Sequence, residues 1–207
     1  GIWGKVYWFK NIGKRKQPKL AKARLVDVAW KGRPPKPAWN WWDPALGTLA
    51  TQWRTPPAVY DWNNDGLNDL IMLDHEGYLA FFQGTRASGG NVLYPPRRIF
   101  KGSGEYDNRH RLRNRNPEGG LLRLNNGLAG KSGRRKLCLT DWDGDGKTDL
   151  LVNSVNVNLL RNAGSTEGMT TFRDVGTLSS LLLAGHTTSP TTVDWNNDGI
   201  PDLLIGA

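Results

Sequence analysis

Three copies of one acidic segment constrain this chain more than any other feature. Each copy reads Asp-Trp-(Asp/Asn)-x-Asp-Gly-x-x-Asp-Leu, and the copies begin at Asp61, Asp141 and Asp194. Oxygen-bearing side chains stand at positions 1, 3, 5 and 9 of each copy, and glycine stands at position 6. Self-similarity of this kind is the sequence signature of a repeat protein, in which each repeat is one supersecondary unit. The chain is therefore expected to fold from repeated units.

The spacing within each copy has a chemical reason. Ca²⁺ takes six to eight oxygen ligands at about 2.3–2.6 Å, and alternate residues of a tightly curled loop can point at one centre. Glycine at position 6 permits the sharp turn, and position 7 offers its backbone carbonyl. We predict about three calcium sites, with these ligands: Asp61, Asn63, Asp65, Leu67 and Asp69; Asp141, Asp143, Asp145, Lys147 and Asp149; Asp194, Asn196, Asp198, Ile200 and Asp202.

Short apolar runs surround each acidic segment, and their lengths are typical of buried strands. First strands are expected at 58–60, 136–140 and 190–193, and second strands at 70–73, 150–152 and 203–205. Third strands are expected at 77–82 and 157–162, and fourth strands at 92–94 to 99–100 and at 171–175. Four antiparallel strands per unit is the pattern of a propeller blade. The predicted fold class is therefore all-β, a β-propeller with metal-binding hairpin loops, and not an EF-hand, which needs flanking helices.

The acidic loops, each followed by an apolar strand and then by a Gly-x-Leu/Val-x-Phe/Tyr strand, resemble the FG-GAP or VCBS repeat family. That family includes the calcium-loop blades of integrin α-subunit heads and many secreted bacterial propellers. The resemblance covers almost the whole chain and leaves out an insertion at about residues 101–135. It implies a propeller with calcium in its loops. It does not imply one function, because the same architecture serves unrelated tasks.

Residues 1–207 are expected to form a single partial propeller, which the repeats divide into parts. Its expected parts are a half blade at 1–50, a blade at 51–105, a basic insertion at 101–135, a blade at 136–188 and a half blade at 189–207. Residues 4–11 match a third strand and residues 202–207 match a second strand, so the two halves could make one more blade. Propellers typically use four to eight blades. Two explanations are left: the chain is part of a longer one, which is the favoured interpretation, or copies assemble into a ring.

The net charge of +9 is concentrated in two segments. Residues 1–40 hold eleven Lys or Arg and one acid, and residues 97–136 hold twelve and three. Arginine presents a planar fork that suits carboxylate and sulfate groups. The candidate ligand-binding arginines of the second segment are Arg109, Arg111, Arg113 and Arg115. A solvated basic loop is the plain interpretation, and a polyanion-binding site is the functional one.

An anionic polysaccharide, carrying uronate or sulfate groups, is the expected partner. Nucleic acid is disfavoured because no nucleic-acid-binding motif is visible and because calcium loops suit the calcium-rich exterior of the cell. A cluster at Trp39, Trp41 and Trp42 offers flat apolar faces for sugar rings. Packing in the propeller core or at an interface is the alternative for these three side chains.

Two function classes follow, a binding module without chemistry and a polysaccharide lyase. For the second class the chain is somewhat similar to the ulvan lyase group, which cleaves a uronate-containing polymer by β-elimination. That chemistry needs a cation to neutralise the carboxylate, a base and an acid. The candidates are His75 or His110 as base, Tyr106 or Tyr94 as acid, and Arg109 or Arg111 as the cation. An integrin-like protein-adhesion module is a third interpretation, in which the basic insertion has no evident role.

The expected location is extracellular or at the cell surface. No run of eighteen apolar residues is present, so a membrane-spanning helix is not expected. The single cysteine, Cys138, excludes an internal disulfide framework. Residues 1–10 do not have the pattern of a signal peptide, so the export signal of a secreted protein was removed or lies outside this chain.

Overall fold

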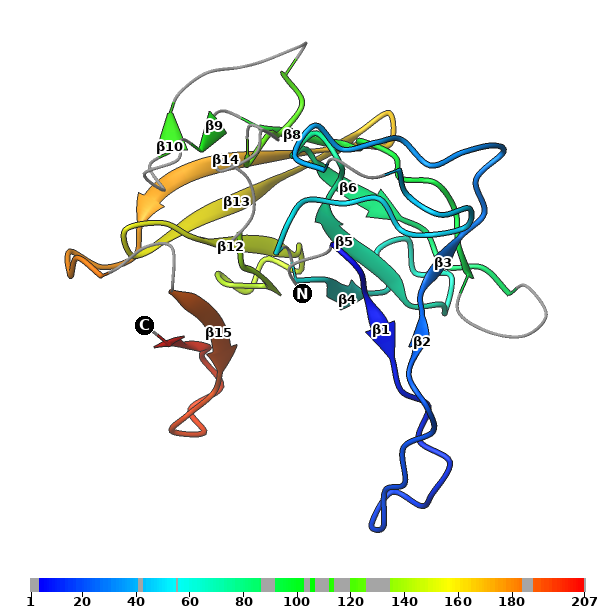
Figure 1. Cartoon of the computed structure of the whole chain (residues 1–207). Helices are drawn as coiled ribbons and strands as arrows, with labels where there is room; N and C mark the ends of the chain where they lie inside the picture. Colours follow the sequence, from blue (N-terminus) through cyan, green and yellow to red (C-terminus); the bar gives the residue numbers. More distant parts are fainter. Residues whose placement is uncertain are drawn as a thin grey trace.

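A computed structural model shows an all-β protein (Figure 1). It describes residues 4–40, 43–54, 56–86, 92–102, 105–106, 112–113, 120–125, 135–183 and 188–206. Within these ranges the chain forms sixteen strands and no α-helix, so the predicted fold class is confirmed. In the same ranges we find no helix long and apolar enough to cross a membrane.

The first blade is a three-stranded antiparallel sheet. It consists of β4 (Ala58–Tyr60), β5 (Asp69–Leu73) and β6 (Leu79–Phe82), in that order. Leu70 lies opposite Val59 on one side and opposite Phe82 on the other. At the fourth position the pairing is reduced to two isolated antiparallel bridges among the described residues, Arg97 to Phe81 and Leu93 to Gly84.

The second blade has all four expected strands. They are β11 (Leu137–Thr140), β12 (Asp149–Asn153), β13 (Val157–Thr166) and β14 (Met169–Thr177). A fifth strand, β8 (Phe100–Gly102), joins the outer edge of β14 in parallel. The sequence places residues 99–100 in the fourth strand of the first blade, and the structure differs. Pro95 and Pro96 precede this segment and have no N–H to donate to a ladder, which prevents a continuous strand there.

The remaining strands form two-stranded sheets. They are β1 (Tyr7–Trp8) with β2 (Arg24–Leu25), β3 (Asp27–Val28) with β7 (Val92–Leu93), β9 (Glu105–Tyr106) with β10 (Leu112–Arg113), and β15 (Ser189–Val193) with β16 (Asp202–Gly206). The β3–β7 pair is parallel. On its other side β7 follows the first blade as the expected fourth strand, because Leu93 bridges Gly84 in antiparallel fashion and the Tyr94 N–H donates to the Gln83 carbonyl at 2.8 Å. Figure 1 shows the β1–β2 hairpin extending away from the sheets, with β15–β16 well separated from it.

The core lies between stacked blades. Successive side chains of a strand point to opposite faces, and β5 follows this rule. Its Ile71 and Leu73 enter one apolar cluster, whereas Leu70 and Met72 enter another. The first cluster also contains Leu150, Val152 and Phe172 of the second blade, so it joins the two blades face to face. The sheets are therefore stacked as propeller blades are, and the structure does not close them into a ring.

Candidate metal centres

The three acidic segments form hairpin loops with one shared backbone conformation. We call residues 61–69, 141–149 and 194–202 acidic loops 1, 2 and 3; they connect β4 to β5, β11 to β12 and β15 to β16. At position 4 the chain adopts a positive φ in each loop: 55° at Asn64, 72° at Gly144 and 61° at Asn197. At position 6, Gly66, Gly146 and Gly199 have φ values of 81°, 80° and 85°. Only glycine, and to a lesser extent asparagine, adopts this region readily, so the local sequence dictates the loop.

The carboxylate at position 1 organises each loop from inside. Asp61 accepts hydrogen bonds from the backbone N–H groups of Asp65 (3.1 Å) and Gly66 (2.9 Å). The same two bonds recur at Asp141 (3.1 and 3.0 Å) and at Asp194 (3.0 and 2.9 Å). Because these N–H groups hold the carboxylate on the inner side of the turn, the loops present preformed oxygen clusters.

The carboxylate at position 9 joins the loop to the blade. Asp69 accepts from the N–H of Trp62 at 2.8 Å and from the N–H of Gly84, just beyond β6, at 2.7 Å. Asp149 has equivalent bonds from Trp142 at 3.1 Å and from Asn162 on β13 at 2.7 Å. Both carboxylates are buried, and burial raises the pKa of each.

Acidic loop 2 passes a simple test of fit to a hard cation. One carboxylate oxygen from each of Asp141, Asp143 and Asp149 lies within 4.8 Å of the other two. Two ligands on opposite sides of a calcium ion are separated by about 4.6–5.2 Å, twice the usual Ca–O distance. Loops 1 and 3 carry an amide oxygen at position 3 in place of the second carboxylate, and calcium also accepts amide oxygens. The chemistry of the donor set therefore fits calcium in all three loops.

The carboxylate at position 5 has a side-chain donor in every loop. Asn63 Nδ2 donates to Asp65 Oδ2 at 2.8 Å, and Asn196 donates to Asp198 in the same way. In loop 2, Lys147 Nζ donates to Asp145 Oδ2 at 2.7 Å. These bonds from Asn63 and Lys147 hold the pKa values of Asp65 and Asp145 below their usual range.

A further cation lies against loop 2. Arg161 of β13 forms an ion pair with Asp143, the position-3 carboxylate. No described residue makes the matching ion pair in loops 1 and 3, where position 3 is asparagine. The extra carboxylate of loop 2 is thus accompanied by a compensating positive charge.

Neighbouring loops are linked by side chains that the sequence analysis did not identify. Tyr60, directly before loop 1, shares a hydrogen bond of 2.8 Å between its hydroxyl and that of Thr148 in loop 2. Cys138 on β11 contacts the Thr192 hydroxyl on β15 at 3.8 Å. The signal available in the sequence was weak, because each contact joins different repeats at positions that the repeats do not share.

Most of the candidate binding and catalytic residues lie outside the described residues. Those without a described position are Trp41, Trp42, Arg109, His110, Arg111 and Arg115. Tyr106 and Arg113 are placed only as backbone, in β9 and β10. Trp39 is 8% exposed and its indole N–H donates to the Thr51 carbonyl at 3.2 Å, so little of its ring faces solvent. Tyr94 is 52% exposed.

His75 lies in the turn between β5 and β6. Its backbone carbonyl accepts a hydrogen bond from the Gln52 amide at 2.9 Å, and its Nδ1 is buried without a partner. Among the described residues, no hydrogen bond or ring contact joins its imidazole to a tyrosine or an arginine. The structure therefore does not place His75 beside the other groups that elimination chemistry requires.

Three arginines at or near the ends of the insertion contact the blades. Arg98 bonds the buried Asp74 at 2.6 Å, pairs with Glu76 and stacks over the Tyr78 ring at 4.0 Å. Its hydrogen bond to Glu76 holds the pKa of that carboxyl below its usual range. Arg97 stacks over an aromatic ring of the first blade at 5.1 Å.

Arg135 is 1% exposed and donates to backbone carbonyls of Leu124 (2.8 Å) and Asn153 (3.0 Å). It therefore braces the second blade and does not belong to an exposed basic surface. Nothing in its local sequence separates it from the other arginines of the same segment.

Fold and loops together define the class of protein: an all-β chain of stacked, propeller-like blades, each with an acidic hairpin loop between its first two strands. The family model described as FG-GAP-like repeat matches residues 141–205, from acidic loop 2 to β16. This part of the chain is an FG-GAP-like repeat, as the sequence predicts. Searches of curated proteins and of solved structures gave no significant match.

Proposed function

We propose that this chain is an extracellular calcium-binding propeller module that binds an anionic polysaccharide. Calcium would be held in the three acidic loops by the ligands predicted above. Its role there is to bring together carboxylates that otherwise repel one another, and so to stabilise the hairpins that carry each blade. The loops are support for the binding function and not the binding surface itself.

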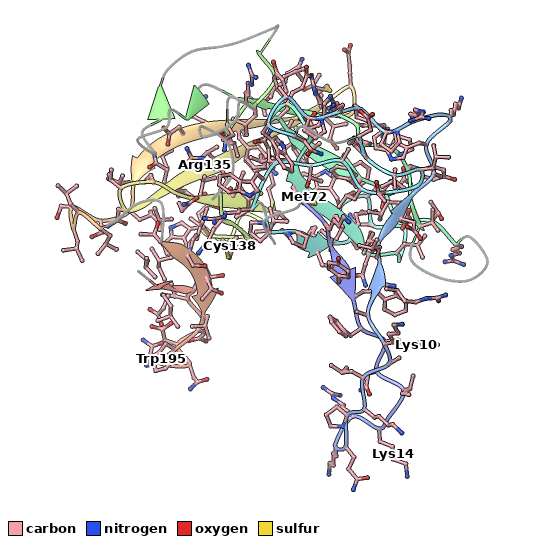
Figure 2. The ribbon with its side chains drawn as sticks, viewed as in Figure 1. Lys10, Lys14, Met72, Arg135, Cys138 and Trp195 are labelled. Carbon is pink, nitrogen blue, oxygen red and sulfur yellow. The ribbon has the colours of Figure 1, made fainter. Side chains whose placement is uncertain are left out.

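The observation that carries the polysaccharide proposal is a basic arm, which we define as residues 9–24 of the β1–β2 hairpin. Every residue from Phe9 to Leu20 is exposed. The arm contains seven cations and no acid: Lys10, Lys14, Arg15, Lys16, Lys19, Lys22 and Arg24. None of these side chains forms an ion pair with a described residue. Figure 2 labels Lys10 and Lys14 along the arm, away from the stacked blades.

The arm is an ordered ribbon and not a loose tail. Backbone N–H groups of Ile12 and Ala21 donate across it to Lys19 O at 2.7 Å and Lys10 O at 2.8 Å. The Asn11 side chain accepts from the N–H of Lys19 at 3.0 Å and so joins both strands. A ribbon that keeps like charges close together favours a partner with regularly spaced negative groups, because such a partner relieves their repulsion.

Exposed aromatic rings at the base of the arm favour a sugar polymer among such partners. Tyr7 and Phe9 are each 53% exposed. Flat apolar faces of this kind suit the apolar faces of sugar rings, while the cations contact carboxylate or sulfate groups. The calcium loops favour the same partner, since calcium and acidic polysaccharides occur together outside the cell. The insertion arginines Arg109, Arg111, Arg113 and Arg115 are further candidate ligands for the same polymer.

The test is binding to polygalacturonate and to a sulfated polysaccharide, measured calorimetrically at two salt concentrations with calcium present. Lys14→Glu with Lys16→Glu is expected to weaken binding at least tenfold, and binding of the unmodified chain should fall as salt rises. Lys31→Glu with Arg33→Glu is the matched control, because it changes the charge equally at exposed sites outside the arm. Equal losses in both double variants, or no binding by the unmodified chain, would refute the proposal.

A further inference from the structure

Acidic loop 2 differs from acidic loop 1 in the charges around its carboxylates. It has four carboxylates, at positions 1, 3, 5 and 9, whereas loop 1 has three and the amide of Asn63. Two cations contact the loop 2 carboxylates: Lys147 pairs with Asp145, and Arg161 pairs with Asp143. No described residue forms an ion pair with a carboxylate of loop 1. Four negative and two positive charges leave −2 at loop 2, against −3 at loop 1.

Arg161 occupies a strand position that the first blade also directs at its loop. In each blade one backbone N–H at the end of the third strand donates to the position-9 aspartate; it belongs to Asn162 in the second blade and to Gly84 in the first. The residue directly before it is Arg161 or Gln83, respectively. Gln83 Nε2 lies 3.4 Å from Asp65 Oδ2, and Arg161 forms the ion pair named above. The same position therefore presents a neutral donor to loop 1 and a positive charge to loop 2.

The neighbouring strand favours this orientation of Arg161. On β14, Arg173 lies directly opposite Arg161. Like charges at directly opposite positions of two paired strands repel one another. Arg173 forms no ion pair with a described residue, so its charge is not neutralised locally. The repulsion disfavours positions of the Arg161 side chain beside Arg173 and favours its contact with Asp143.

The two cations bind carboxylates that the loop backbone already holds. Asp143 Oδ1 accepts from the N–H of Asp145 at 3.3 Å, and Arg161 pairs with Oδ2. Asp145 Oδ1 accepts from the N–H of Lys147 at 2.9 Å, and the Lys147 ammonium pairs with Oδ2. Both cations reduce the repulsion among the carboxylates, which is also what a divalent cation does there. Their charges oppose a second cation at the same loop, because charges this close are only partly screened.

We propose that Arg161 and Lys147 are internal counter-ions that weaken calcium binding at acidic loop 2 and keep this loop formed when calcium is absent. Loop 2 then releases calcium at concentrations at which its carboxylates, without the two cations, would stay saturated. The second blade depends less on calcium for the same reason. This inference rests on the calcium sites of the proposed function and not on the polysaccharide.

A calcium titration followed by NMR on the ¹⁵N-labelled full chain resolves the individual loops. Each loop has its own reporter, the position-6 glycine, whose backbone N–H donates to the position-1 carboxylate. These reporters are Gly66, Gly146 and Gly199. The chain is first stripped with a chelator, and the calcium concentration at half-saturation is then measured at each glycine.

Exchanges between the two blades give the decisive variants. Arg161→Gln copies the first blade and should lower the calcium concentration at half-saturation of Gly146 about threefold to tenfold. Lys147→Leu copies position 7 of loop 1, keeps the backbone carbonyl, and should act in the same direction. Gln83→Arg is the reverse exchange; it should raise the half-saturation concentration at Gly66 and leave that at Gly146 unchanged.

Arg173→Gln is the matched control, because it removes the same charge from the strand beside Arg161 without touching loop 2. It should not lower the half-saturation concentration at Gly146. In chelator, the Tm of Arg161→Gln with Lys147→Leu should lie below that of the unmodified chain, and that of Arg173→Gln should not.

An unchanged or raised half-saturation concentration at Gly146 in Arg161→Gln would overturn the proposal, as would an equal effect of Arg173→Gln. An unchanged Tm of the double variant in chelator would overturn the claim that the cations keep the loop formed. If Gly66 and Gly199 respond to calcium as expected, such results reject this inference alone. If none of the three glycines responds, the calcium sites of the proposed function fail together with it.

Discussion

The position-9 aspartates of the three loops are one residue type in one local conformation, with different surroundings. Asp69 and Asp149 each accept two backbone N–H groups, one from the loop and one from the strand beyond. Asp202 accepts one, from Trp195, and is only half-buried. A comparison of Asp69→Ala with Asp202→Ala therefore measures how much the hydrogen bond from the strand beyond contributes to stability, apart from the hydrogen bond within the loop.

The expected free-energy changes follow from these bonds. A hydrogen bond to a charged group contributes about 1.5–3 kcal/mol, so removing Asp69 and leaving two N–H groups unpaired is expected to cost 3 kcal/mol or more. Burial already raises the pKa of Asp69, which means that the charged form is partly disfavoured, so we expect the lower end, about 3 kcal/mol. Asp202→Ala removes a single hydrogen bond, which is more exposed to solvent than those of Asp69. It is expected to cost about 1 kcal/mol.

Thermal unfolding in the presence of a chelator measures these values without a metal contribution. For a chain of this size, 1 kcal/mol shifts the Tm by about 2–4 °C. Asp69→Ala should lower the Tm by roughly 6–12 °C and Asp202→Ala by roughly 2–4 °C, with Asp149→Ala close to the former. Equal shifts for all three variants would refute the reasoning, because they would mean that the strand N–H contributes nothing.

Three further predictions concern packing, pH and the link between loops. In urea unfolding, Trp62→Ala should lower the free energy of unfolding by about 2 kcal/mol, and Trp195→Ala by less than about 0.5 kcal/mol. The reason is that the Trp62 indole packs against another sheet and the Trp195 indole is exposed. Similar costs for the two variants would contradict this. Glu76 has a lowered pKa in the folded state, so its contribution to stability is present above the unfolded pKa of about 4.3 and is lost as pH falls through the lower folded value. The Tm of Glu76→Gln should therefore fall less than that of the unmodified chain between pH 5 and 3, and parallel curves would count against the ion pair. Tyr60→Phe and Thr148→Val should show a coupling of about 0.5–1 kcal/mol in a double-mutant cycle, and additive effects would show that their hydrogen bond does not join the loops.

The repeat signal was sufficient to predict the main sheets and the loop conformation. Asp, Asn and Gly at fixed positions determine the turn locally, through side-chain acceptors and positive φ values. The apolar runs at 70–73 and 150–152 predicted strands buried on both faces, and β5 and β12 are such strands. In these elements the local sequence and the blade stacking favour the same conformation, which is why prediction succeeded.

Contacts between different repeats could not be predicted from the sequence. The parallel pairing of β8 with β14 joins residues about seventy positions apart, and no periodicity in either segment indicates it. Arg135 lies within a basic run, which predicted an exposed charge, yet its side chain is buried and donates to the backbone carbonyls of Leu124 and Asn153. These features depend on how finished sheets pack together. The calcium ligands and the polysaccharide site stay predictions.

Calcium titration of the chelator-stripped chain tests the central claim most directly. The three acidic loops predict saturable binding of about three equivalents, with a rise in Tm on saturation. A ligand that binds only the folded state stabilises it by about 2.7 kcal/mol per site at one hundred times its Kd, so the rise should be several degrees. Asp141→Asn with Asp143→Asn should remove one equivalent. No binding, and a Tm that is the same in calcium and in chelator, would contradict the account.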